Sequence, residues 1–275
     1  MTRLKPAFLV VATFSLSVLA PLHAEESSVR PAEIVEIPLN PLPFVLKGAL
    51  RRPDGEGPFP AAILLPSCGH LAGAVDEVWG QSLLSWGFAT LTLDVFTPRE
   101  GAGERACISP APAGLAEDAY RGLNVLASRK YVDPKHVFVI GFGRSNLLVF
   151  GAIERDGIER DARRRFRGAV AFYPPACGAA KGNLTAATLI IVGARDDALE
   201  ACRKLAQGED DMGISRQRGA GAPIQLAIMA DAYAGFDLPE FKKGIDVHGY
   251  HIEYSQSATD RAKATLRQFL QSMIE

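Results

Sequence analysis

Side chains of three types in this sequence could together carry out nucleophilic catalysis. Ser145 follows a glycine turn, Asp196 follows a later apolar run, and His248 and His251 come after the last apolar run before the C-terminal segment. In such a set the histidine takes the proton of the hydroxyl, and the carboxylate orients the imidazole. The chain order serine, aspartate, histidine therefore indicates hydrolytic acyl transfer as the chemistry to test.

The segment 131–152 has the pattern of a strand, a sharp turn and a helix. The turn signal Asp133-Pro134 precedes the apolar run 137–140, which fits a strand buried on both faces. After a glycine turn, Ser145 begins an apolar segment long enough for a helix. A nucleophile is commonly held at such a strand-to-helix turn, at a strained φ between small neighbours.

Two registers place different residues at this turn. In the first, Gly141 and Ser145 are the small neighbours, and Gly143 takes the nucleophile position without any side chain. In the second, Ser145 is the nucleophile, Leu147 stands where a small residue is needed, and the turn is two residues longer. We favour the first register, in which the attacking atom is missing.

Composition and charge narrow the classes of partner. The chain has 275 residues, of which 48% are hydrophobic and 22% charged, and these values are ordinary for a globular protein. The formal net charge of −1 gives no indication of nucleic acid as a partner. The basic triplet 163–165 is mixed with acidic residues, so we interpret it as a solvated face rather than a site for an anionic partner.

The N-terminal segment has the pattern of a secretory signal peptide. Two basic residues precede an apolar run at 7–20, and Ala24 stands before a polar start. A membrane-spanning helix needs roughly 20 apolar residues, so this run is short for an anchor. We predict that residues 1–24 are removed, that residues 25–275 form the exported chain in the periplasm, and that no other part contacts a membrane.

Four cysteines remain in the exported chain, where an oxidising compartment favours disulfides. Metal binding is the alternative, but no pair has the C-x-x-C spacing and no histidine completes a ligand pattern. We therefore expect no metal and no cofactor. The number of cysteines alone allows three connectivities.

The remaining chain alternates apolar runs with helical patterns. Strands are expected at 29–37, 45–52, 61–65, 88–93, 168–173, 189–193 and 224–229, the last of these being the final strand, and helices at 115–128, 201–206 and 258–274. A further helix should begin with Asp76 as its N-cap. This alternation predicts one α/β domain whose mostly parallel sheet is covered by helices on both faces.

With these landmarks placed, the chain resembles the dienelactone hydrolase family of α/β-hydrolases, particularly its exported bacterial members. The resemblance covers roughly residues 45–270. The matching segments are LLPSCGHL at 64–71, LDVFTPRE at 93–100, YVDPKHVFVIGF at 131–142, VAFYPPAC at 170–177, IIVGARDD at 190–197, AYAGFD at 232–237 and YSQSATDRAKATLRQFL at 254–270. Seven segments in the right order imply the α/β-hydrolase fold and, for the family, hydrolysis of esters or lactones.

The resemblance also assigns the three catalytic positions. The acid follows the run 189–193, where Asp196 fits, although an aspartate before a helix is also a natural cap. The histidine belongs to a Tyr-His-x-Phe-Asp-like stretch, in which this chain has Ala234. Gly143 stands at the nucleophile position. Two of the three catalytic residues that the resemblance implies are therefore absent from their expected positions.

The oxyanion hole of the family is better preserved. One donor is the backbone N–H after the nucleophile, here that of Arg144, and the other comes from a loop in which Cys68 and Gly69 match the family. These donors imply a pocket that binds a small carbonyl or carboxylate compound without chemistry.

The implied fold also suggests how the cysteines pair. Loops after neighbouring strands of such a sheet meet above its carboxyl edge. Cys68 and Cys107 follow adjacent strands, as do Cys177 and Cys202. We therefore expect the disulfides Cys68–Cys107 and Cys177–Cys202.

Three hypotheses follow. The first is an exported pseudoenzyme of this family that keeps a pocket for a small ligand. The second is an active hydrolase that uses Ser145 with His248 or His251 and Asp196. The third is an interaction protein with a filled pocket.

Overall fold

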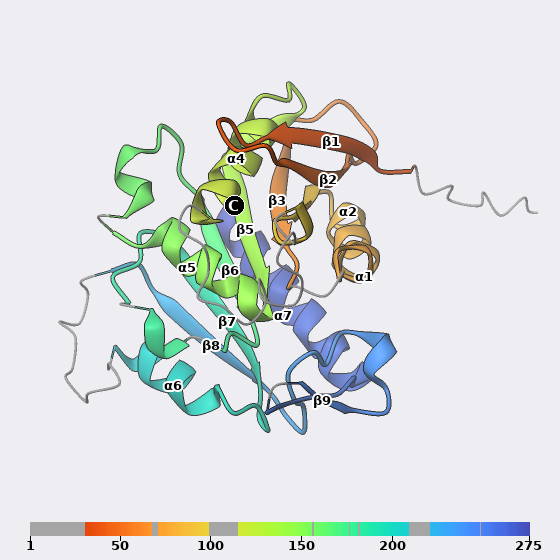
Figure 1. Ribbon diagram of the computed structural model, residues 1–275, viewed down its shortest axis with the longest axis vertical. Coiled ribbons are helices and arrows are strands. Elements are labelled where there is room, and N and C mark those ends of the chain that lie inside the picture. Colours follow the sequence, from red (N-terminus) through yellow and green to blue (C-terminus); the bar gives the residue numbers. More distant parts are fainter. Residues whose placement is uncertain are drawn as a thin grey trace, which may run out of the picture. The chain divides into compact units, whose positions relative to one another are not determined.

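Eight strands in the described part of the chain assemble into one sheet (Figure 1), in the order β1-β2-β4-β3-β5-β6-β7-β8. They are β1 (Glu33–Pro38), β2 (Val45–Arg51), β3 (Phe59–Leu65), β4 (Ala89–Asp94), β5 (Val132–Phe142), β6 (Gly168–Phe172), β7 (Ala187–Gly193) and β8 (Ile224–Met229). The pairs β1–β2 and β2–β4 are antiparallel, and every other neighbouring pair in the sheet is parallel. The prediction of a mostly parallel sheet is confirmed.

The computed structural model describes residues 31–67, 71–98, 115–155, 157–175, 177–180, 182–208, 221–247 and 249–275. All of them belong to one compact unit, Pro31–Glu275. The predicted signal peptide lies outside the described residues, as do Cys68, Gly69, Cys107 and His248.

Helices cover both faces of the sheet and divide the core in two. On one face pack α4 (Leu115–Ala127), α5 (Asn146–Ile153) and α6 (Leu199–Gln207). On the other pack α7 (Gln256–Ile274) and a continuous helical run made of α1 (Ala72–Val75), the π-helical η1 (Asp76–Gly80) and α2 (Gln81–Ser85). The 3-10 segments are η3 (Gly143–Ser145), η4 (Ile158–Asp161), η5 (Cys177–Ala179) and η6 (Pro239–Phe241).

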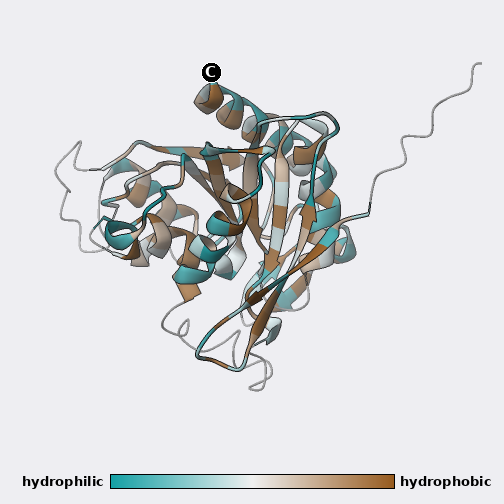
Figure 2. Ribbon diagram, turned by 90° about the horizontal axis from the view of Figure 1, so that it is seen from above, coloured by the Kyte–Doolittle hydropathy of each residue, from teal (hydrophilic) through white to brown (hydrophobic). Residues whose placement is uncertain are grey.

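The central strands form the apolar centre of the molecule (Figure 2), while the helices carry mixed hydrophobic and hydrophilic residues. Val137, Phe138, Val139 and Ile140 of β5 are all fully buried, and their side chains divide between the two core clusters. A strand buried on both faces needs no alternation of polar residues. This is why the apolar run 137–140 identified the central strand.

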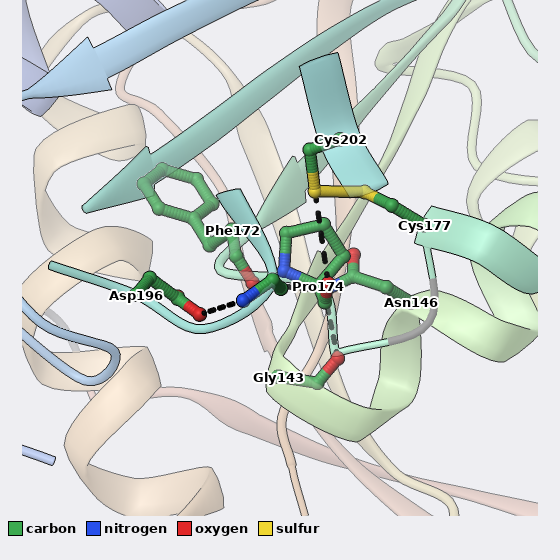
Figure 3. The surroundings of a disulfide bond; sticks show 8 residues. Gly143, Asn146, Phe172, Pro174, Cys177, Asp196 and Cys202 are labelled. Atoms are coloured by element: carbon green, nitrogen blue, oxygen red, sulfur yellow. Dashed lines mark hydrogen bonds between the residues drawn. A yellow bond between two sulfur atoms is a disulfide. The ribbon is translucent and has the colours of Figure 1, made fainter. Parts of the chain in front are cut away.

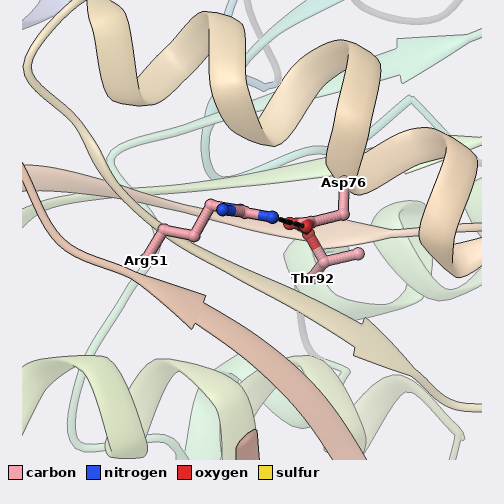
Figure 4. Close-up of polar contacts among 3 residues, drawn as sticks. All are labelled: Arg51, Asp76 and Thr92. Carbon is pink, nitrogen blue, oxygen red and sulfur yellow. Dashed lines mark hydrogen bonds and ion pairs between the residues drawn. The ribbon is translucent and has the colours of Figure 1, made fainter. Parts of the chain in front are cut away.

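The prediction that Asp76 caps a helix is wrong. The helical run begins at Ala72, and Asp76 lies inside it with only 7% of its surface exposed. Its carboxylate accepts hydrogen bonds from the Arg51 guanidinium at 2.6 and 3.0 Å and from the Thr92 hydroxyl at 2.9 Å (Figure 4). Asp76 therefore links the helical run to β2 and β4 by a buried ion pair.

The prediction that 224–229 is the last strand is also wrong. After β8 the chain forms a separate hairpin of β9 (Ile245–Val247) and β10 (Tyr250–Ile252), in which Ile245 pairs with Ile252. The residues of β9 are all exposed, and those of β10 are exposed or half-buried. A three-residue strand without a buried face leaves no apolar pattern in the sequence.

Candidate functional site

The turn between β5 and α5 places Gly143 at its tip. Gly143 has φ +53°, a left-handed conformation that costs little only for glycine. Gly141 must be small, because a Cβ there would lie 2.6 Å from atoms of both Asn146 and Val149. This geometry corresponds to the register in which Gly141 and Ser145 flank Gly143.

Ser67 lies beside this turn and was not singled out in the sequence. A Cβ added to Gly143 would lie 3.1 Å from Ser67 Oγ and 3.6 Å from a ring carbon of Tyr173. The backbone N–H of Arg144 donates a hydrogen bond to Ser67 Oγ at 3.3 Å. The Ser67 hydroxyl therefore lies next to the position predicted for the nucleophile side chain. It also accepts the hydrogen bond of the Arg144 N–H, which is the predicted oxyanion-hole donor.

Ser145, the alternative nucleophile, is fully buried at the start of α5. Its hydroxyl donates a hydrogen bond to the carbonyl oxygen of Pro66. The bond ties the turn to the loop after β3, and it uses the proton that a catalytic base would have to remove. In this arrangement Ser145 acts as the small residue after the turn.

Asn146 stabilises the turn between β5 and α5 through two side-chain hydrogen bonds. Its side-chain amide donates to the carbonyl oxygens of Gly143 and Phe172, each at 2.8 Å (Figure 3). It therefore fixes the turn to the end of β6. Since Asn146 reads in the sequence as one residue of an apolar helix, no local signal identified this role.

Asp196 follows β7, as its assignment to the acid position requires. Its Oδ1 atom accepts a hydrogen bond from the N–H of Ala198 at 2.9 Å (Figure 3). Its Oδ2 atom is buried and has no hydrogen-bond partner among the described residues. Burial raises the pKa of this carboxyl above its ordinary value. One oxygen therefore has a capping role, and the other faces no donor.

The loop after β8 brings Ala234 to the loop that carries Asp196. The N–H of Arg195 donates to the carbonyl oxygen of Ala232 at 2.9 Å, so the two loops run side by side. Ala234 forms a parallel bridge to Ile252. Ala234 therefore lies in the loop that runs beside the Asp196 loop, and its assignment to the histidine position stays a prediction.

His251 takes part in a different interaction. Its Nδ1 atom lies 2.9 Å from Asp246 Oδ1, its Nε2 atom lies 3.0 Å from Glu253 Oε2, and its ring packs edge-on against Tyr233. The carboxylates of Asp246 and Glu253 raise the pKa of the imidazole. Both ring nitrogens are engaged, and the structure forms no hydrogen bond between His251 and Ser145. His248 lies outside the described residues.

A buried polar group next to the turn was missed in the sequence. Asp237 is fully buried, and its Oδ2 accepts a hydrogen bond from the indole N–H of Trp79 at 2.5 Å. Burial raises the pKa of Asp237 to about 6, and the hydrogen bond from Trp79 opposes this rise. The Tyr173 hydroxyl lies beside this carboxyl, although no hydrogen bond of good geometry joins them. Burial, followed by the charge of Asp237, raises the pKa of Tyr173.

Tyr173 also has an unusual backbone. Its φ is +37°, which is rare for a residue with a side chain and is found most often at functional positions. Its ring contacts Phe142, Phe172 and Phe236. The strain and the aromatic contacts together hold the ring against Gly143.

One predicted disulfide is present. Cys177 and Cys202 are joined and link η5 to α6 (Figure 3). A disulfide is compatible with an exported protein. The other predicted pair, Cys68–Cys107, lies outside the described residues and stays a prediction.

The described residues contain no cluster of three or more histidine, cysteine, aspartate or glutamate residues placed to hold a metal ion. Among the helices of the same residues, none combines the length and the hydropathy of a membrane-spanning segment.

Comparison with solved structures establishes the fold. The chain is similar to a dienelactone hydrolase from Anabaena variabilis ATCC 29413, with 17% identity, a TM-score of 0.60, and coverage of 88% of this chain and 97% of that chain. A dienelactone hydrolase-like promiscuous phosphotriesterase from metagenomic libraries has 17% identity, a TM-score of 0.64, and coverage of 88% and 98%. Est1E from Butyrivibrio proteoclasticus has 14% identity, a TM-score of 0.59, and coverage of 88% and 98%.

The chain thus has the α/β-hydrolase fold, with dienelactone hydrolase-like proteins among its structural neighbours. No family model matches the sequence, and no curated protein matches it.

Proposed function

We propose that this protein is an exported, dienelactone-hydrolase-like protein that no longer hydrolyses esters through a serine nucleophile and instead binds a small carbonyl or carboxylate compound at the turn after β5. The observation that carries the proposal is Gly143 at the tip of that turn, with the Ser67 hydroxyl beside it. The fold keeps the framework of a hydrolase, while the attacking atom is absent from its position.

The surroundings of Asp196 support loss of the histidine as well. In a working triad the acid accepts a hydrogen bond from the imidazole. Here Asp196 Oδ2 is buried without a partner among the described residues, and Ala234 stands in the neighbouring loop. Once one member of a triad is lost, loss of the others costs little more activity, so the two changes are expected together.

The backbone N–H of Arg144 supports the part of the proposal that concerns ligand binding at the turn after β5. In a hydrolase such an N–H stabilises the oxygen of the substrate carbonyl. Here it donates to Ser67 Oγ at 3.3 Å, which is long for a hydrogen bond. A carbonyl or carboxylate oxygen of a ligand would replace the Ser67 hydroxyl at this donor. The ligand therefore competes with Ser67, a short side chain that can rotate away.

Introducing a serine at position 143 and a histidine at position 234 tests whether their absence explains a loss of ester hydrolysis. Because a Cβ at Gly143 would lie 3.1 Å from Ser67 Oγ, the restoring variant is S67A/G143S/A234H rather than the two catalytic changes alone. We expect it to hydrolyse p-nitrophenyl acetate at least about 100-fold faster than the wild type, since a positioned base alone contributes about 10²–10⁴-fold.

The matched control is S67A/G143A/A234H, which has the same backbone strain and no hydroxyl at position 143. It should remain inactive. A restored variant that folds, as judged by circular dichroism, and gains no hydrolysis over this control would show that Gly143 or Ala234 is not the catalytic position.

A second experiment tests the binding site. Acetate is the probe, and binding is followed by the chemical shift of the Arg144 amide in NMR spectra. Ser67→Ala removes the competing hydroxyl, so we expect acetate to bind more tightly to this variant than to the wild type. Equal responses of the two proteins would argue against a ligand site at the Arg144 amide.

Export is part of the proposal. It is supported by the signal-peptide pattern of residues 1–24 and by the Cys177–Cys202 disulfide. Mass spectrometry of the protein from the periplasmic fraction should find an N-terminus at Glu25. Retention of the full chain in the cytoplasm would contradict export.

A further inference from the structure

A recess lies at the edge of the sheet opposite to the edge at which Gly143 lies. Gly143 follows the carboxyl end of β5, whereas this recess is lined by Arg167, immediately before β6, and by Ala187, the first residue of β7. Its volume is about 620 Å³. This falls within the range of about 300–1,000 Å³ that is typical of small-molecule sites.

The recess is strongly basic, and we call it the basic groove. Five cationic side chains line it, namely Lys135, Arg163, Arg164, Arg165 and Arg167, and none of its lining residues is acidic. The chain as a whole has a net charge of −1, so this concentration of positive charge is local. The backbone N–H of Lys135 donates a hydrogen bond to Asp133 Oδ1 at 2.9 Å, and the charge of Lys135 is one of the smaller causes that lower the pKa of that carboxyl.

The other three arginines are anchored through one nitrogen each. Arg165 Nε lies 2.7 Å from Glu159 Oε1, and Arg167 Nε donates to the Met273 carbonyl oxygen at 2.9 Å. Arg164 Nη1 donates to Asn124 Oδ1 at 3.2 Å. These contacts orient the guanidinium groups and leave their other nitrogens for a ligand. Side chains that are already oriented lose less entropy when a ligand binds.

From the sequence alone we interpret 163–165 as a solvated face, but the structure places these arginines around one recess. We infer that the basic groove binds a small compound with several phosphate groups. Four of its five cations are arginine, whose planar guanidinium group donates paired hydrogen bonds to phosphate oxygens. Several adjacent cations without an acidic lining residue favour a ligand with several negative charges over a single anion. Phe166, between these arginines in the chain, is buried in the core, where its ring packs against Tyr120 with the ring centroids 5.2 Å apart, so it anchors the segment that carries the cations.

This site is independent of the proposed function. Its lining residues contribute nothing to the turn at Gly143, and the test needs no catalytic activity. Failure of one proposal therefore leaves the other in place.

Isothermal titration of the purified protein with inorganic tripolyphosphate tests the inference at about 0.15 M salt, where long-range attraction is screened. The groove variant is R163Q/R164Q. The matched control is K47Q/K243Q, which removes two positive charges from exposed lysines outside the groove. We expect the groove variant to bind about 10-fold more weakly or worse, because it removes two positive charges and their charge-assisted hydrogen bonds to phosphate oxygens. The control should bind like the wild type.

Two further comparisons sharpen the result. The variant R163K/R164K keeps the charge and loses the paired geometry, so its affinity should also fall. Citrate carries three carboxylates, and therefore at least one negative charge fewer than tripolyphosphate near neutral pH, and should bind more weakly than tripolyphosphate. The inference is overturned if the wild type does not bind tripolyphosphate, if both glutamine variants weaken binding equally, or if citrate binds as tightly.

Discussion

Two buried polar clusters in this protein differ in how well their atoms are satisfied. Around Asp76, both carboxylate oxygens accept hydrogen bonds from Arg51 and Thr92 (Figure 4). At the carboxyl edge of the sheet, Asp196 Oδ2, Asp237 Oδ1 and the Tyr173 hydroxyl are buried without a hydrogen bond of good geometry in the described part of the chain.

A buried polar atom without a partner costs free energy, so most such atoms in native proteins are paired. The Asp76 cluster obeys this rule and joins three elements of the fold. The three carboxyl-edge atoms do not obey it, so we expect substitutions there to cost less stability than a substitution of Asp76.

The largest effect is expected from removing Asp76. Asp76→Ala takes away the carboxylate that faces the partly buried Arg51 guanidinium, so we expect a loss toward the lower end of the about 3–5 kcal/mol that breaking a fully buried pair costs. The free energy of unfolding in urea measures this loss. Thr92→Val, which removes one neutral donor, should cost only about 1 kcal/mol. Equal losses in the two variants would mean that the ion pair is not the main contribution.

The next effect is a pH dependence at Asp237. Its pKa rises from 3.8 to about 6 on folding, so between these values the folded state binds more protons than the unfolded state, and stability falls as pH rises. The stability of the wild type relative to Asp237→Asn should therefore decrease by about 2–3 kcal/mol between pH 4 and pH 7.

Thermal unfolding across this pH range measures the effect. The matched control is Asp197→Asn, which makes the same substitution at an exposed position. A constant difference for Asp237→Asn would mean that Asp237 does not change its protonation between those pH values.

A smaller effect is expected at Ser145. Ser145→Ala removes the hydrogen bond to the Pro66 carbonyl and should cost about 1 kcal/mol, measured by urea unfolding. The exposed Ser128→Ala variant should be close to neutral. Loss of measurable ester hydrolysis in Ser145→Ala, but not in Ser128→Ala, would instead identify Ser145 as a nucleophile.

The smallest effect is expected at Asp196. Asp196→Asn keeps an oxygen for the Ala198 N–H and removes the charge whose burial is unfavourable, so the unfolding free energy should change by less than about 0.5 kcal/mol. Asp196→Ala loses the cap and should cost about 1 kcal/mol. If Asp196→Asn were as costly as Asp196→Ala, the carboxylate would have a partner that the described residues do not provide.

The sequence could predict the sheet because its inner strands are buried on both faces. Apolar runs such as 137–140 and 189–193 indicate buried strands from the local sequence alone, without knowledge of the neighbouring strands. The hairpin 245–252 has no such run, since its strands are short and largely exposed. The position of Gly143 also followed from the sequence, because small residues two positions on either side define the turn.

Contacts between distant segments could not be predicted. An aspartate before an apolar stretch indicates a helix cap, and only the fold brings Arg51 and Thr92 to Asp76. In the same way, nothing local to Ser67 indicates that it lies beside Gly143, 76 residues later in the chain. The framework of the site was therefore predictable, and the side chains that fill it were not.

Labelling with a fluorophosphonate tests the central claim most directly, because this reagent bonds covalently to an activated serine hydroxyl. Intact-mass analysis should find no adduct on the wild-type protein and one adduct on the S67A/G143S/A234H variant. An adduct on the wild type that maps to Ser145 or Ser67 would contradict the account, since it would show that another hydroxyl has taken over the role missing at Gly143.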